Sequence, residues 1–463
     1  MSFPVELKST KTKNLGRGSL VMLNDIKILL DIQDKNILIE ENSVNYGEYK
    51  GMKAKFIDAR LTYTPTHCLK CNAVNEGTSI YKNGTQTSRI TLPMMGLYPT
   101  FLRLKKQRFV CKTCGCSFTA KTSIVKKHCF ISNSVKTQIV VKASEAQSIK
   151  NISRDCSVSD ATVQRVINEV ANKNKRYNHV LPEHLSFDEF KYAKSRMAFN
   201  YIDTNSGKIL DILPSRDHFT IKNHFISRYS LSKMRKVKTV TIDMNAGYVS
   251  VIKELFPNAK IIIDRFHIVQ LITRSMNKTR VKIMNQFKTS NSGDLKKYRR
   301  LKRYWKLLLK RESELSYTKY SYFRLFGQQT EASIIHEMLS YSDELEVNYR
   351  LYQKILKALD KRDYQMLKHI LHTDISNEIS AYIRTSIKTL KKHLPYIHNS
   401  LKYPYNNGRL EGIINKVKVL NRVSYGYRNF NHYKNRIILH FSFRSVDRKN
   451  KVNLKNKLRT TVA

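Results

Sequence analysis

The sequence predicts an α/β protein with a large additional helical part, on two main observations. Within residues 181–270, short runs rich in β-branched residues alternate with helical patterns, as in a domain built of β-α-β units. Within residues 271–403 the pattern is almost entirely helical and glycines are few. A third observation adds a small metal-binding module ahead of both parts, because four cysteines form two C-x-x-C pairs.

Composition shifts divide the chain into seven expected segments. They are an N-terminal segment (1–62), a cysteine module (63–130), a helical pair (131–175), an α/β part (181–270), a helical part (271–403), a last helical piece (404–445) and a basic tail (446–463).

The charge balance points to a polyanionic partner. The chain of 463 residues carries 84 Lys and Arg against 36 Asp and Glu, a formal net charge of +48. Such an excess repels itself unless a polyanion neutralises it, and nucleic acid fits because it releases counterions on binding. A protein attached to ribosomes or to a membrane surface is the alternative. The charge is spread along the chain, which favours a long footprint on nucleic acid.

We expect a protein located in the cytoplasm and associated with DNA. Residues 1–10 lack the apolar segment of an export signal, and no apolar run approaches the roughly 18 residues of a membrane span. The seven cysteines are consistent with a reducing compartment, where C-x-x-C pairs bind metal more often than they form disulfides. We therefore expect no membrane partner.

The two cysteine pairs predict a structural zinc site. Cys68 and Cys71 form the first pair, and Cys111 and Cys114 form the second. Each tight turn can supply two thiolates to a tetrahedral Zn²⁺ ion, and four thiolates leave no open position for catalysis. Other ligands remain possible at this point, namely Cys116, Cys129 and His67. The alternative is a set of reduced cysteines in an ordinary core.

Residues 148–170 predict two helices joined by a turn. Ser159 is a suitable N-cap for the second helix, whose apolar residues recur at i, i+3, i+4 and i+7. Two helices joined this way suit a reader of the DNA major groove, although a helical hairpin that merely links domains has the same pattern. The polar residues of the second helix that can reach base edges are Thr162, Gln164, Arg165 and Asn168.

Acidic residues stand where three predicted strands end. Asp188 ends the run 185–188, Asp243 ends 237–242 and Asp264 ends 260–263. A helical pattern between the last two runs predicts a β-α-β unit, so these strands should be parallel neighbours whose ends share one crevice. Carboxylates crowded there need cations, and a pair of Mg²⁺ ions is suited to phosphoryl displacement.

Glu411 lies in the first turn of a further predicted helix and could reach over the edge of this sheet. A lone acid is more often part of a salt bridge or an N-cap. Two strand-end aspartates in one β-α-β unit make coincidence less probable, but they do not identify a reaction by themselves.

At these residues the chain resembles the DDE transposases of the ISL-three-type insertion-sequence family. The matching strings are Ser186–Phe190, Asp243-Met244 with Tyr248, Asp264–His267, Glu411-Gly412 with Asn415–Lys418, and Arg422–Phe430. Ile414 departs from the family's usual asparagine. The resemblance covers nearly the whole chain, with the cysteine module and the helical pair in the family's order.

The resemblance implies a ribonuclease-H-like catalytic core interrupted by the helical part, preceded by a zinc ribbon and a helix-turn-helix. It assigns the catalytic triad to Asp188, Asp243 and Glu411, which would hold two Mg²⁺ or Mn²⁺ ions. We place Asp264, Arg265 and His267 outside the triad, as residues that support it.

The implied function is that of a transposase of a bacterial insertion sequence, which binds terminal inverted repeats and target DNA and performs strand cleavage and strand transfer. Joining two ends implies a homodimer or a larger assembly. The segment 422–430 interleaves basic and aromatic residues, so Arg422, Tyr425 and Arg428 are candidate DNA contacts, or else parts of a solvated loop. We expect Trp305 to be a buried anchor, with base stacking as the alternative.

Two other functions stay open on sequence alone. A domesticated regulator would bind DNA without cutting it, and a metal-dependent nuclease would cut without joining.

Overall fold

The computed structural model describes residues 26–175, 180–244, 246–373 and 378–444. The expected basic tail, 446–463, lies outside these residues. The chain forms two compact units, one made of Met1–Tyr177 with Val419–Ala463 and the other of Asn178–Lys418. Among the described residues, no helix is both long and apolar enough to cross a membrane.

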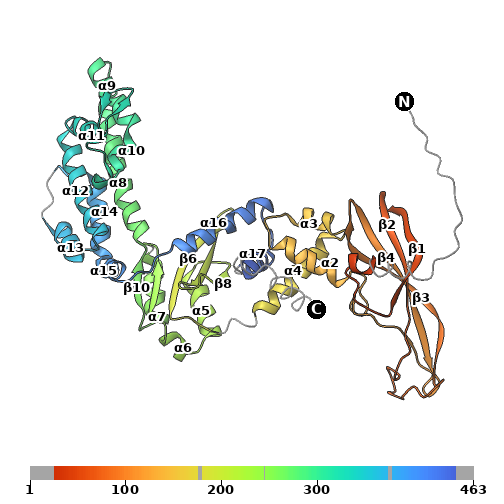
Figure 1. The fold of residues 1–463 in the computed structure, drawn as a ribbon. Helices are drawn as coiled ribbons and strands as arrows, with labels where there is room; N and C mark the ends of the chain where they lie inside the picture. The colour runs from red at the N-terminus through yellow and green to blue at the C-terminus, as the bar shows by residue number, and fades with distance from the viewer. Residues whose placement is uncertain (1–25, 176–179, 245, 374–377, 445–463) are drawn as a thin grey trace, which may run out of the picture. The chain divides into compact units, whose positions relative to one another are not determined.

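A five-stranded sheet begins the first unit (Figure 1). Its order is β1-β2-β4-β3, with β5 paired to β4, and only the β2–β4 pair is parallel. One face packs on an apolar core that includes Cys68 and Cys111. The strands are β1 (Ile37–Tyr49), β2 (Met52–Leu61), β3 (Ile80–Met95), β4 (Tyr98–Cys111) and β5 (Ser117–Thr119).

This sheet joins two segments that we expected to be separate. β1 and β2 come from the expected N-terminal segment, whereas β3 to β5 belong to the expected cysteine module. They unite because β2 pairs with β4 and the apolar residues of both strands enter the same core.

Four helices complete the first unit around a second apolar core. The last of them, α17, packs against α4 and α2 although some 250 residues separate it from them in the sequence, and its Leu439 enters that core. The expected piece 404–445 is therefore divided, and its part from Val419 onward belongs to the first unit. These helices are α2 (Asn133–Ala143), α3 (Ile149–Asp155), α4 (Asp160–Lys175) and α17 (Phe430–Arg444).

The second unit contains a mixed sheet of order β10-β9-β6-β7-β8. The strands β6, β9 and β10 are parallel neighbours, whereas β7 and β8 are antiparallel additions on the other side of β6. Its elements are β6 (His184–Ala193), β7 (Arg196–Asp203), β8 (Ile209–Leu213), α5 (His218–Arg228), α6 (Leu231–Arg235), β9 (Thr239–Ile242), α7 (Ala246–Leu255) and β10 (Lys260–Ile263).

The expected β-α-β unit is present as β9, α7 and β10. The expected end of a strand at Asp188 is wrong, because β6 continues to Ala193. Its pairing with β9 stops at Ser186, but its pairing with β7 carries the strand on.

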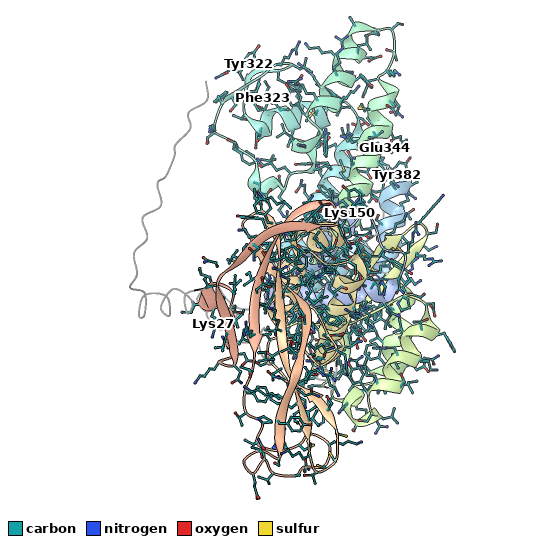
Figure 2. All side chains as sticks on the ribbon, turned by 90° about the vertical axis from the view of Figure 1, so that its right-hand side faces the viewer. Lys27, Lys150, Tyr322, Phe323, Glu344 and Tyr382 are labelled. Atoms are coloured by element: carbon teal, nitrogen blue, oxygen red, sulfur yellow. The ribbon has the colours of Figure 1, made fainter. Side chains whose placement is uncertain are left out.

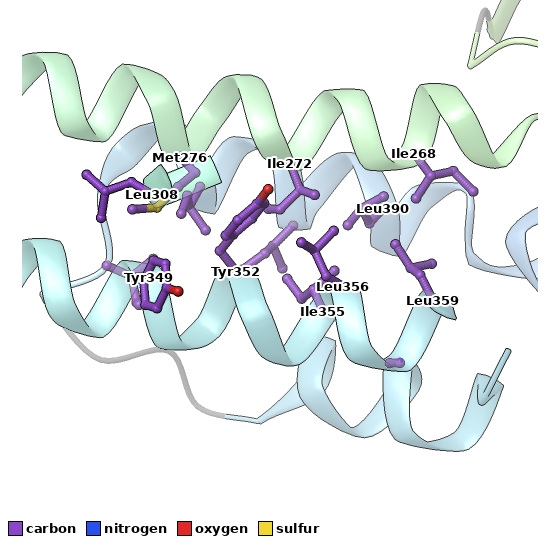
Figure 3. Close-up of a cluster of buried hydrophobic side chains, with 14 of the residues drawn as sticks. Ile268, Ile272, Met276, Leu308, Tyr349, Tyr352, Ile355, Leu356, Leu359 and Leu390 are labelled. Carbon is purple, nitrogen blue, oxygen red and sulfur yellow. The ribbon is translucent and has the colours of Figure 1, made fainter. Parts of the chain in front are cut away.

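A helical part follows β10 and has its own apolar core (Figure 3). Ile268 and Ile272 of α8 face Tyr352, Leu356 and neighbouring residues of α12 there. The elements are α8 (Arg265–Gln286), α9 (Ser292–Arg303), α10 (Trp305–Leu309), η1 (Glu312–Glu314), β11 (Ser321–Phe323), β12 (Gly327–Gln329), α11 (Glu331–Leu339), α12 (Asp343–Asp360), α13 (Tyr364–His372), α14 (Ala381–Lys392) and α15 (Leu394–Lys402). The next helix, α16, spans Gly408–Val423.

Candidate active site and DNA-binding modules

The parallel strands bring three aspartates to one edge of the second sheet. Ser186 of β6 pairs with Thr241 of β9. Two residues further on, β6 carries Asp188, and Asp243 directly follows the end of β9. Ile242 is paired with Ile263 of β10, so Asp264 follows at the same edge, where its N–H donates to the carbonyl of Ile242 at 2.8 Å.

Asp188 lies in surroundings that disfavour its negative charge. Its pKa is raised to about 6, chiefly by burial and also by the charge of Asp243. The Glu189 N–H, which donates to its Oδ1 at 2.7 Å, and the charge of His267 oppose this shift. A bound cation would relieve this cost, because it favours the ionised carboxylate.

Asp264 and Glu411 are the other two members of the acidic group, which also contains Asp188 and Asp243. Asp264 is buried and caps α8, and burial raises its pKa. The backbone N–H groups of Phe266 and Asn407 and the charge of His267 oppose this shift, whereas the charge of Glu411 adds to it. Glu411 is exposed and lies in the first turn of α16, as we expected.

Asn407 holds the start of α16 against the central strand. Its side-chain Nδ2 donates to the carbonyl of Phe187 at 3.2 Å, and its own carbonyl accepts from the N–H of Glu411 at 2.8 Å. Phe187 directly precedes Asp188, so one buried side chain links the Glu411 helix to the Asp188 strand. Sequence analysis missed Asn407, although its place before the glycine that opens a helix was a signal for a capping residue.

The last helix of the helical part, α15, packs against β10, the strand that precedes this part in the chain. Ser400 Oγ of α15 donates to the carbonyl of Ile263 at 2.5 Å, and Asn399 Nδ2 donates to the carbonyl of Ile261 at 2.8 Å. The chain thus leaves the end of β10 in α8 and comes back along β10 in α15 before α16 begins (Figure 1).

Arg265 and His267 lie beside the acids in different roles. Arg265 donates from Nη1 to the carbonyl of Ser400 at 3.4 Å, so it contacts the returning helix α15. His267 acts electrostatically on both Asp188 and Asp264. Of the two, His267 is the residue whose charge lowers the pKa of both Asp188 and Asp264.

Glu189 was missed as a site residue although it stands in one of the matching strings. It forms an ion pair with Arg216 and accepts a hydrogen bond from the hydroxyl of Tyr248 at 2.8 Å. Tyr248 belongs to α7, the helix that follows Asp243 in the chain, and Glu189 directly follows Asp188. These contacts connect the segments that carry the two aspartates.

The carboxylate oxygens of the described acidic residues do not form a cluster as compact as that of the cysteine sulfurs. Within the part of the chain that the structure describes, only four cysteines bring all their ligand atoms within 4.8 Å of one another.

The four cysteines are those that we expected, Cys68, Cys71, Cys111 and Cys114. The sulfurs of Cys68 and Cys114 are 3.7 Å apart, and those of Cys71 and Cys111 are 3.8 Å apart. Four sulfurs at about 2.3 Å from a tetrahedral Zn²⁺ ion are separated by about 3.8 Å, so the donor set fits zinc.

Both cysteine turns have the same backbone design. In the first turn, Asn72 follows Cys71 with a φ of 55° and donates its N–H to the carbonyl of Cys68. In the second turn, Gly115 follows Cys114 with a φ of 68° and donates its N–H to the carbonyl of Cys111. The pKa of the Cys111 thiol is lowered to about 6, chiefly because the N–H of Cys114 donates to its sulfur. The alternative ligands Cys116, Cys129 and His67 are not members of the cluster.

The helices α3 and α4 lie on either side of a short turn, as expected. Ser159 Oγ accepts from the N–H of Thr162 at 3.3 Å and caps α4, while Ser157 turns the chain with a φ of 52°. The apolar face of α4 is buried, and Arg165 is exposed on the helix.

Two of the expected base-reading residues contact α17 or each other. Asn168 Oδ1 accepts from Gln164 at 2.9 Å and from Asn435 of α17 at 2.8 Å. Arg436 of α17 is buried and donates to the carbonyls of Glu145 and Gln147 between α2 and α3. The side chains of Gln164 and Asn168 thus have partners within this unit, whereas Arg165 is exposed.

The expected DNA segment 422–430 begins at the end of α16 and presents one very exposed ring. Tyr425 is 95% exposed and has a φ of 54°, and Gly426 donates to the carbonyl of Asn421 at 2.9 Å. This is a helix end of the Schellman type with a tyrosine where glycine is usual. Arg422 and Arg428 are also exposed, whereas Tyr427 stacks on Tyr433 of α17 at 4.7 Å between ring centroids.

The expectation that Trp305 is a buried anchor is wrong. Its exposed fraction is 38%, because it occupies the first position of α10 while Leu308 fills the core. The same helical part exposes further rings, including Tyr322 of β11 (Figure 2).

Comparison with known proteins identifies two regions of the chain. A family model described as transposase, of the DDE type named after ISL3, matches residues 185–437. A second model, described as the zinc finger of the transposases IS204, IS1001, IS1096 and IS1165, matches residues 64–114. The chain belongs to the ISL3 family of DDE transposases, as the matching strings predicted.

Two curated relatives are similar over parts of the chain. The transposase for insertion sequence element IS1001 of Bordetella parapertussis is 26% identical over 256 residues, which cover 53% of this chain and 58% of that protein. A Lactococcus lactis subsp. lactis protein named ATP-dependent protease is 39% identical over 110 residues, which cover 24% of this chain and 35% of that protein. The chain thus spans between about a third and three fifths of the length of these relatives.

Proposed function

We propose that the protein is the transposase of a bacterial insertion sequence, which binds the element's terminal inverted repeats and then cleaves and joins DNA strands. Membership of the family supports this activity. The observation that carries the residue assignment is the meeting of Asp188, Asp243 and Asp264 at one sheet edge, to which Asn407 ties the helix of Glu411.

The second sheet supports a ribonuclease-H-like catalytic core. Its central strand β6 carries the first acid, the parallel neighbour β9 precedes the second, and two antiparallel strands lie on the other side. The third acid follows the helical insertion, which explains how 168 residues can separate Asp243 from Glu411 (411 − 243).

We assign the catalytic metal ligands to Asp188, Asp243 and Glu411. Two Mg²⁺ or Mn²⁺ ions held there would supply the activation of the attacking oxygen and the stabilisation of the leaving oxygen in an in-line displacement. Asp188 offers a carboxylate whose burial makes a bound cation favourable, and Asn407 ties the helix that carries Glu411 to the strand that carries Asp188. Asp264 and His267 support the ligands from β10 and α8, and no covalent bond to the protein is needed.

DNA recognition is assigned to the first unit. The zinc ribbon and the helix-turn-helix of α3 and α4 would bind the terminal repeats, with Arg165 and Thr162 nearest to the bases. Arg422, Tyr425 and Arg428 would contact DNA close to the cut. Because two element ends must be joined, the working complex is at least a dimer.

A cleavage and joining assay tests this function. The purified chain is incubated with Mg²⁺ and a labelled duplex that carries the inverted repeat flanking its reading frame. Cutting followed by joining to a second duplex is expected. Shifted but uncut DNA would indicate a DNA-binding regulator, and cutting without joining would indicate a nuclease. Asp188→Ala should abolish cutting while binding persists, and normal cutting by this variant would refute the assigned triad.

A further inference from the structure

The first sheet has a second face that its apolar core does not use. Side chains alternate between the two faces of a strand, so residues 57, 59 and 61 of β2 and 102 and 104 of β4 enter the core, while their neighbours point the other way. Figure 2 shows this sheet with its side chains drawn.

This second face carries rings and cations from all four long strands. We call it the basic-aromatic face, and its members are Tyr49 of β1, Phe56 and Arg60 of β2, Arg89 of β3, and Phe101, Arg103 and Lys105 of β4. The strand register sets them in rows, since Phe56 is paired with Phe101, Arg89 with Arg103, and Arg60 with Lys105. Its one acid within these rows is Asp58, which forms an ion pair with Arg103 at 2.5 Å.

The rings contact one another and the two arginines. Phe56 stacks on Phe101 at 5.5 Å between centroids, and Tyr49 lies 4.6 Å from Phe101. The guanidinium of Arg89 lies 4.8 Å from the centroid of Tyr49 and 5.4 Å from that of Phe101, and that of Arg103 lies 5.4 Å from Phe56. Phe101 is only 2% exposed as a result.

This arrangement suits phosphate groups better than bases. A guanidinium that lies over a ring uses its flat face there, while its N–H groups still point outward from its edge. The stacking also restricts the side chain in advance, so less conformational entropy is lost when it binds an anion. Bases, in contrast, stack on open ring faces. Here Phe101 is buried, and guanidinium groups lie over the rings of Tyr49 and Phe56.

We propose that the basic-aromatic face binds the phosphate backbone of the DNA at the element end. This inference rests on the proposed function, and it adds a DNA contact outside the zinc turns, outside α3 and α4, and outside the acidic edge. The opposite charges of the face and of the backbone identify the partner, and the contact is independent of base sequence.

The salt dependence of DNA binding tests the proposal. Arg89→Gln with Lys105→Gln removes two exposed cations of the face and leaves the Arg103–Asp58 ion pair intact. The probe is a duplex of about 50 base pairs that carries the element end. Each lost phosphate contact lowers the slope of log affinity against log salt by about 0.9, so the magnitude of the slope should fall by about 2 and the affinity at 100 mM salt by about tenfold or more.

The matched control removes the same charge elsewhere in this unit. Lys126→Gln with Lys127→Gln changes two exposed lysines of a loop outside the sheet and should keep the wild-type slope. Zinc content and the melting temperature show that both variants fold. The inference is wrong if the face variant has the same slope of log affinity against log salt as the wild type or the control. That result is also expected if the face binds an acidic protein and not DNA.

The cleavage assay separates this failure from that of the proposed function. Wild-type protein that cuts and joins DNA, together with an unaltered slope for the face variant, contradicts only the role of the basic-aromatic face. Wild-type protein that neither binds nor cuts the element end contradicts both.

Discussion

At the scale of single residues, the burial of Asp188 makes its negative charge unfavourable, a cost that a metal ion at the proposed site would relieve. Its folded-state pKa of about 6 exceeds the ordinary value of 3.8, so ionisation above pH 6 costs the metal-free protein free energy. The stabilisation of the protonated form is complete below pH 4 and is lost as the pH rises through 6. The cost at pH 8 is about 1–3 kcal/mol, because each pKa unit corresponds to about 1.4 kcal/mol.

Asp188→Asn should therefore stabilise the zinc-loaded protein at pH 8 without Mg²⁺, since the amide can still accept the N–H of Glu189. We expect the gain to vanish near pH 4 and cleavage to be lost at any pH, as measured by urea unfolding and by the strand-cutting assay. Asp343→Asn, at an exposed acid of α12, should give no such gain. A variant that is less stable than wild type at pH 8 would show that Asp188 is held by a partner charge instead.

Tyr425 offers a second trade-off between stability and function. A left-handed backbone costs a residue with a side chain about 1 kcal/mol, and a ring that is 95% exposed recovers almost nothing by packing. Tyr425→Gly should raise the free energy of unfolding by about 0.5–1 kcal/mol and weaken binding of the element end about fivefold or more.

Tyr425→Phe is the matched control, because it retains the ring and the strain. It should bind DNA like the wild type, as measured by fluorescence anisotropy. A glycine variant that binds with unchanged affinity would remove Tyr425 from the DNA contacts.

At the scale of elements, the position of α16 depends on Asn407. Asn407→Ala removes the hydrogen bond to the carbonyl of Phe187 in β6, which costs about 1–2 kcal/mol of stability because a buried acceptor loses its partner. We expect the cutting rate to fall by about 10- to 100-fold with unchanged affinity for the element end.

Asn406→Ala is the neighbouring control. It removes only an exposed hydrogen bond to the N–H of Gly408 and leaves the contact with β6 in place. Equal losses of rate in both variants would mean that the anchoring of α16 to β6 is not what matters.

In the zinc ribbon, substitutions can distinguish the cysteines assigned as zinc ligands from the other cysteines. Cys71→Ser removes one donor of the tetrahedral set and should lower the bound zinc from about one ion per chain to well below half, as measured by a zinc-release assay. Specific binding of the element end should weaken with it.

Cys129→Ser should keep the zinc, because this cysteine is outside the cluster. A loss of zinc in this control, or full zinc in the Cys71 variant, would contradict the ligand set.

At the scale of the whole molecule, local patterns and long-range contacts were predictable to different degrees. The cysteine pairs, the cap at Ser159, the strand ends before Asp243 and Asp264, and the helix of Glu411 each follow from a few neighbouring residues. Three other features do not follow from neighbouring residues. The exposure of Trp305 depends on Leu308, which fills the core in its place. The partner of Asn168 is Asn435 of α17, and the length of β6 depends on its pairing with β7.

The two sheets show the same contrast. In the second sheet, the parallel pairing of β9 with β10 follows from the β-α-β unit that they form with α7, because such units follow general rules of chain connection. The union of β1 and β2 with β3 and β4 depends on a parallel pairing across the cysteine module, which no short motif specifies. The basic-aromatic face was invisible for this reason, since its rows exist only once the strands are in register.

The central claim is that Asp188, Asp243 and Glu411 converge on a pair of divalent ions. The most direct measurement is anomalous X-ray scattering from crystals of the protein bound to element-end DNA and soaked in Mn²⁺. We expect two manganese peaks about 4 Å apart, with oxygens of all three residues as ligands. Manganese bound elsewhere, or a Glu411 carboxylate that contacts neither ion, would contradict the account.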